Sequence, residues 1–100
     1  MRPVLAIDLL CAGRVLLKTH PDHRETVAKA LIAGAKVADR HRARTGLMHP
    51  EFGSGTLADA ARSSGMAPEP TVCDPEFAQS LVQVLNAVIE ATSATHRISQ

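Results

Sequence analysis

The sequence predicts an all-α protein, a single-domain array of four helices with a long central second helix. Apolar residues recur at three- and four-residue spacing, start and stop signals bound each stretch, and no stretch alternates apolar and polar residues as a strand does. The chain has 100 residues, which suits one core. That core is expected to be aliphatic, since sixteen residues are alanine and only Phe52 and Phe77 are aromatic.

The first helix is predicted over residues 8–18. Asp8 precedes its apolar pattern, so we expect the carboxylate to cap the free amide groups at the helix start. A turn is expected at residues 19–22. Asp22 and Glu25 have the spacing of a capping box and predict the start of a second helix.

The second helix is predicted over residues 22–44 and is apolar around most of its circumference, which indicates cover by other helices or by a second copy. Its basic end complements the helix dipole, and Gly46 supplies a left-handed residue that ends it. Gly34 costs about 1 kcal/mol relative to alanine in a helix interior. We expect this glycine to let another backbone approach closely.

Two more helices are predicted, over residues 56–64 and 74–92. Thr56 and Asp59 form a capping box at the first of these, which ends near Gly65, and an extended crossing follows over residues 66–73. Asp74 is expected to cap the last helix, with Pro75 at its first position. The apolar stripe of this helix consists of Phe77, Leu81, Val84, Leu85, Val88 and Ile89. A polar tail from about residue 93 is expected to fray.

Composition narrows the classes of function. The net charge is +1 with both signs mixed along the chain, so no global field draws the protein to nucleic acid or to an anionic membrane. The apolar runs are too short and too charged to span a bilayer, and we expect a cytoplasmic protein. Cys11 and Cys73 lack metal-site spacing and are expected to be buried or half-buried thiols in a reducing compartment.

The segment of residues 40–55 is the candidate binding site, because it combines a basic helix end with histidine and glycine. Arg40 and Arg44 lie four residues apart and share one helix face. The loop after Gly46 can fold back to that face and create a corner that attracts anions. The predicted binding residues are Arg40, Arg44, His49, Gly53, Ser54 and Gly55. No catalytic residue is assigned.

The sequence supports metal binding and catalysis less than it supports the binding corner at residues 40–55. His20 with His23, and His41 with His49, are possible ligands, but about 30 Å separates the ends of a helix of this length, so no metal or cofactor is predicted. Ser54 lies between glycines as in a nucleophile elbow, yet no strand precedes it.

Several motifs carry a resemblance: RPVL, ADRHRARTG, HPEFGSGTL, APEP and CDPEF, in this order. The set resembles small uncharacterised alphaproteobacterial proteins that share a helix end of the form ADRxRxRTG followed by HPxxGxGSL. The resemblance covers most of the chain. It implies a stand-alone bacterial protein and assigns no activity and no functional residue.

The function expected from these features is a non-enzymatic protein-interaction module of unknown partner, homodimeric, with residues 40–55 facing the partner. The alternative is a small anion- or nucleotide-binding enzyme that uses the same segment. A second alternative is weak nucleic-acid binding through the basic helix end, which the lack of Trp and Tyr makes unlikely. A flat surface would favour the module, and a concave pocket with convergent polar groups the enzyme.

Overall fold

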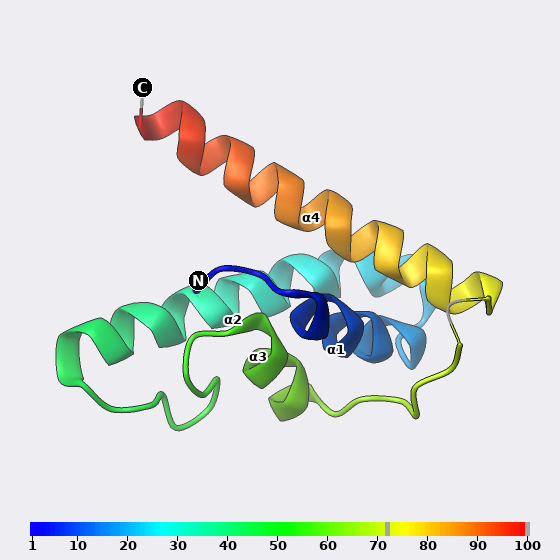
Figure 1. Ribbon diagram of the computed structural model, residues 1–100, viewed down its shortest axis with the longest axis horizontal. Coiled ribbons are helices and arrows are strands. Elements are labelled where there is room, and N and C mark those ends of the chain that lie inside the picture. Colours follow the sequence, from blue (N-terminus) through cyan, green and yellow to red (C-terminus); the bar gives the residue numbers. More distant parts are fainter. Residues whose placement is uncertain (72, 100) are drawn as a thin grey trace.

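The computed structural model describes residues 1–71 and 73–99, with side chains of the last helix up to Ser93, and confirms the all-α class. Four α-helices and one short 3-10 turn make up the described part, which contains no strand (Figure 1). The elements are α1 (Ala6–Leu17), η1 (Pro21–His23), α2 (Arg24–Thr45), α3 (Leu57–Ser64) and α4 (Pro75–Ser99). The central helix α2, with 22 residues, contacts α1, α3 and α4, and α4 crosses it as the longest helix, with 25 residues.

Helix α1 begins two residues before the predicted start, and the expected N-cap role of Asp8 was wrong. Leu5 holds the N-cap position, and Asp8 Oδ2 accepts a hydrogen bond from the Leu5 amide at 2.7 Å. Asp8 Oδ1 accepts a second one, at 2.9 Å, from the amide of Ala58 in the first turn of α3. The side chain therefore satisfies the amino-terminal ends of two helices at once, which explains why a carboxylate that is only 3% exposed is tolerated.

The predicted capping box of Asp22 and Glu25 does not form. The ring of His20 replaces it, because His20 Nδ1 accepts a hydrogen bond from the Asp22 amide at 3.2 Å and holds residues 21–23 in the 3-10 turn. Helix α2 consequently starts at Arg24, two residues later than predicted.

Arg24, at the junction of α1 and α2, is a second buried charged residue, with an exposure of 6%. Its Nε donates to the carbonyl oxygens of Leu16 at 2.7 Å and Thr19 at 3.1 Å, and its Nη2 donates to Leu17 at 3.3 Å. The guanidinium also lies 3.8 Å from the Glu76 carboxylate of α4. Arg24 thus satisfies carbonyl groups that the end of α1 leaves without helical partners.

Glycines shape α2 in two ways, one predicted and one not. Gly46 has a φ of 76° and donates its amide to the Arg42 carbonyl at 2.8 Å, which confirms the predicted helix end. The prediction for Gly34 was wrong, because the group that packs against it is the ring of Phe52 and not another backbone. A Cβ atom at residue 34 would lie 2.9 Å from Phe52 Cδ1, so only glycine leaves space for this ring.

Local signals start α3 and α4 as predicted, except that only half of the capping box of Thr56 and Asp59 forms, because the Asp59 carboxylate accepts from Ser54 and not from the Thr56 amide. Thr56 Oγ1 accepts from the Asp59 amide at 3.1 Å, and Asp74 Oδ1 accepts from the Phe77 amide at 3.0 Å with Pro75 first in α4. Between these helices, residues 66–71 form an irregular crossing, while Val72 of the predicted crossing lies outside the described residues.

The crossing segment is held to α1 by one residue pair. The side chain of Arg14 donates to the Ala67 carbonyl at 2.7 Å, and the Ala67 amide donates to the Arg14 carbonyl at 3.2 Å.

Helix α4 continues to Ser99, seven residues beyond the predicted end at residue 92. The reason is that residues 93–99 contain neither glycine nor proline, so no residue there stops a helix once it has formed. The polar side chains of the tail from residue 94 lie outside the described part.

Candidate functional site

Two arginines that were predicted to bind lie on the surface at the end of α2. Arg40 and Arg44 are exposed, as is Arg42 between them. Among the described residues, no hydrogen bond or ion pair involves any of these three guanidinium groups. In particular, Arg44 is not paired with Glu51. The helix end therefore presents three positive charges that no acidic side chain of the described structure neutralises.

The loop after α2 is organised by His49. Its amide and carbonyl exchange hydrogen bonds with Gly53, at 2.8 and 3.0 Å. Its ring Nδ1 also accepts hydrogen bonds from the amides of Glu51 and Phe52, both at 3.1 Å. Because Nδ1 acts as an acceptor here, the ring orders the loop that it belongs to.

The loop folds back on α2, where its contacts are with Gly34, Asp39 and His41 and not, as predicted, with the face of Arg40 and Arg44. The ring of His49 stacks on Phe52, with centroids 5.1 Å apart, and meets the His41 ring of α2 edge to face at the same centroid distance. Phe52 in turn occupies the space that Gly34 leaves on α2. Three rings and one glycine therefore join the loop to the helix.

The backbone amides expected to cradle an anion have acceptors within the chain. The Gly53 amide donates to His49, and the Ser54 amide donates to Asp59 Oδ2 at 3.1 Å. Gly55 is buried so close to α2 that an added Cβ would lie 2.8 Å from the Cα of Asp39. An anion at this corner would consequently depend on side chains and not on the amides of Gly53 and Ser54.

Ser54 belongs to a small polar network at the start of α3. Its hydroxyl donates to Asp59 Oδ2 at 2.5 Å, and Asp59 Oδ1 accepts from Arg62 at 2.8 Å. The Ser54 hydroxyl lowers the pKa of the Asp59 carboxyl below its ordinary value of about 3.8, and the Ser54 amide and Arg62 add to this effect against the opposing effect of burial. An Asp59 that stays ionised and accepts three donors serves the local structure.

Leu47 and Met48 lie in the same segment and were not among the predicted binding residues. They are 68% and 59% exposed, although they are large and apolar. Thr45 fixes the turn before them, because its hydroxyl donates to the His41 carbonyl at 2.8 Å and accepts from the Leu47 amide at 3.1 Å. The available signal was two adjacent apolar residues in a loop, next to a run of arginines.

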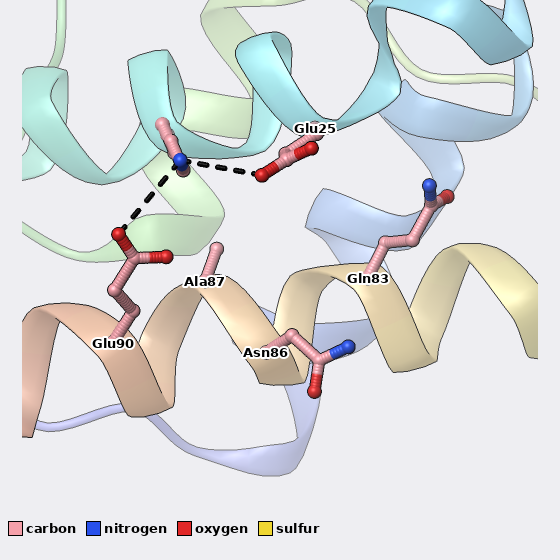
Figure 2. A pocket seen from close by; sticks show the side chains of 6 residues that line it. Glu25, Gln83, Asn86, Ala87 and Glu90 are labelled. Atoms are coloured by element: carbon pink, nitrogen blue, oxygen red, sulfur yellow. Dashed lines mark ion pairs between the residues drawn. The ribbon is translucent and has the colours of Figure 1, made fainter.

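A groove of about 250 Å³ lies between α2 and α4, away from the predicted site (Figure 2). Five of the six residues that line it have polar or charged side chains. Lys29 of α2 forms ion pairs with Glu25, at 3.3 Å, and with Glu90 of α4, at 3.8 Å. Figure 2 shows Glu90, Asn86 and Gln83 along α4 at this groove. The Lys29 ammonium thus bridges the two helices, and its charge is neutralised within the domain.

The four histidines whose side chains the structure describes form two separate pairs. His20 and His23 have ring centroids 5.8 Å apart at the start of α2, whereas His41 and His49 meet at its end. In the described part of the chain, no three His, Cys, Asp or Glu side chains gather as a metal site would require. Both cysteines are free; Cys11 is buried as predicted, but the prediction was wrong for Cys73, which is exposed in the turn before α4.

The protein is a small all-helical domain. Its segment of residues 40–48 exposes three arginines and two large apolar side chains. None of its described helices is long and apolar enough to cross a membrane. The chain belongs to the family described as Domain of unknown function (DUF7742), whose model matches residues 2–88. No curated protein and no solved structure matches it.

Proposed function

We propose that this domain is a non-enzymatic protein-interaction module, which works as a homodimer and binds a partner protein through residues 40–55. The origin in an alphaproteobacterium and the cytoplasmic location suggested by the sequence are part of this proposal. The observation that carries it is the exposure of Leu47 and Met48 in a hydrogen-bonded turn, beside the unpaired Arg40, Arg42 and Arg44.

The chemistry of this corner favours a partner segment with acidic and apolar side chains. Guanidinium groups form paired hydrogen bonds with carboxylates, and arginine is among the residues that contribute most to protein interfaces. Leu47 and Met48 offer apolar surface next to these charges, and methionine adapts its shape to different partners. Because Thr45 and His49 already order the turn, little conformational entropy is lost on binding.

The anion- or nucleotide-binding enzyme has less support. Such an enzyme needs polar groups that converge on one point, whereas the Gly53 and Ser54 amides donate within the chain and the arginines face solvent. Nucleic-acid binding has only the arginine run in its favour.

Co-purification from the protein's own cytoplasm tests the proposal. We compare the wild type with Arg44→Ala and Leu47→Asp, and with Lys18→Ala as a matched control at an exposed cation elsewhere. We expect both corner variants to lose about tenfold or more of the captured partner, while Lys18→Ala retains it. The stability of Arg44→Ala should stay within about 0.5 kcal/mol of the wild type. A lower melting temperature with unchanged capture would show that the corner is structural.

A further inference from the structure

The apolar residues of α4 form two parallel seams, of which the domain uses only one. The inner seam packs against α1 and α2 and consists of Phe77, Leu81, Val84, Val88 and Ala91. The outer seam consists of Ala78, Val82, Leu85, Ile89 and Thr92. Both follow the four-three spacing of residues that pack between neighbouring helices. Figure 1 shows α4 along one edge of the described part of the chain, with the other helices on one side of it.

The outer seam is exposed at its large residues. Val82, Leu85 and Ile89 have exposures of 48%, 44% and 60%. They occupy successive turns and so form a continuous stripe, unlike apolar residues scattered singly over a surface. By contrast, the apolar side of α2 over residues 27–38, the other candidate for self-association, is largely buried in the domain's own core.

We propose that the outer seam of α4 packs against the same seam of a second copy, in an antiparallel arrangement with Leu85 at the two-fold axis. This inference rests on the proposed homodimer and adds its surface and its symmetry. A two-fold contact requires a surface that is compatible with itself. The edge of the seam toward solvent consists of Gln79 and Asn86, whose uncharged amides both donate and accept hydrogen bonds.

Charge favours a second copy over a charged partner on this face. A row of like charges beside the seam would repel its own copy across a two-fold axis. Glu90, the acidic residue nearest to the seam, is already paired with Lys29 at 3.8 Å. The surface that α4 offers is therefore apolar and bordered by neutral hydrogen-bonding groups.

The orientation follows from the charges at the start of α4. Asp74 and Glu76 are exposed there, so a parallel pair would bring four carboxylates together. In the antiparallel pair, the carboxylates of the two copies lie at opposite ends of the contact. The two helix dipoles also oppose each other in this arrangement, which is favourable.

Sedimentation tests the surface. We expect the wild type to be a dimer at micromolar concentration, and Leu85→Asp to weaken dimerisation about 100-fold or more, because the buried charge enters the contact twice. Leu47→Asp, a matched change at another exposed leucine, should leave the dimer intact. A monomeric wild type would refute the proposed homodimer itself. A dimer that survives Leu85→Asp would refute the outer seam alone.

Cysteine cross-linking tests the orientation, in a Cys73→Ser background that removes the exposed thiol. Along a helix with a rise of about 1.5 Å per residue, residue 82 lies about 9 Å from its own copy in the antiparallel pair but close to residue 89 of the partner. A mixture of Val82→Cys and Ile89→Cys should thus form the disulfide-linked dimer, and Val82→Cys alone should not. Efficient linkage of Val82→Cys to itself would indicate a parallel pair and overturn the proposal.

Discussion

Replacing Asp8 with asparagine tests whether one side chain joins the starts of α1 and α3. The two side chains have nearly the same shape, but asparagine has one carbonyl oxygen and one amino group where Asp8 has two acceptors. The amides of Leu5 and Ala58, at 2.7 and 2.9 Å, cannot both be satisfied. The amino group of the asparagine then faces one of these two backbone amides, so two donors meet in a buried position.

The expected loss combines three contributions. A lost hydrogen bond to a charged group costs about 1.5–3 kcal/mol, and the remaining bond weakens when its acceptor becomes neutral. Removing a negative charge from two helix starts costs a further 0.3–1 kcal/mol or so at each. Allowing for overlap among these contributions, Asp8→Asn should lower the free energy of unfolding by about 3 kcal/mol. For a domain of this size, the melting temperature should fall by roughly 12–24 °C.

Thermal and denaturant unfolding, followed by circular dichroism at one fixed protein concentration, measures this loss. Asp22→Asn is the control, since the Asp22 side chain is 82% exposed and its change should cost less than about 0.5 kcal/mol. If Asp8→Asn were as stable as this control, the carboxylate would not join the two helix starts energetically.

Three further changes probe other contacts. Arg24→Ala should cost about 2–4 kcal/mol in urea unfolding, because the last turn of α1 loses its buried donors; a loss under 1 kcal/mol would contradict this role. Gly34→Ala should gain none of its helix-propensity advantage of about 1 kcal/mol in the wild type, but should gain it in a Phe52→Ala background, and equal effects in both backgrounds would rule out the ring contact. The pKa of Asp59 is lowered in the folded protein, so its contribution to stability is present above pH 4 and is lost as pH falls through the folded pKa. The difference in unfolding free energy between wild type and Asp59→Asn should therefore shrink on acidification. A difference that stays constant with pH would contradict this role.

Features that depend on neighbours in the sequence were predictable. Gly46, Thr56 and Asp74 act on backbone groups within four residues, so their roles follow from residue type and spacing. Asp8 and Arg24 could not be predicted in this way. Asp8 bonds an amide 50 residues away, and no local pattern specifies which distant group a buried charge will meet.

The binding role of the basic corner stays a prediction. The return of the loop to α2 was predictable from its glycines, although the loop meets the helix at His41 and not at the predicted face of Arg40 and Arg44. The hydrogen-bond acceptor of the Ser54 amide was not predictable. The Asp59 carboxylate could have accepted from the Thr56 amide, as in a capping box, but it accepts from Ser54. That choice depends on how the loop packs, which spacing alone does not reveal.

Helix α1 has a further property that follows from Asp8 and Arg24. At one end of this 12-residue helix, the amide of Leu5 donates to a carboxylate that also bonds α3, and at the other end the Leu16 and Leu17 carbonyls accept from a guanidinium of α2. An isolated helix of this length is marginal in water. Helix α1 should therefore not persist when α2 or α3 detaches, and its amides should exchange with solvent deuterium only when the whole domain unfolds.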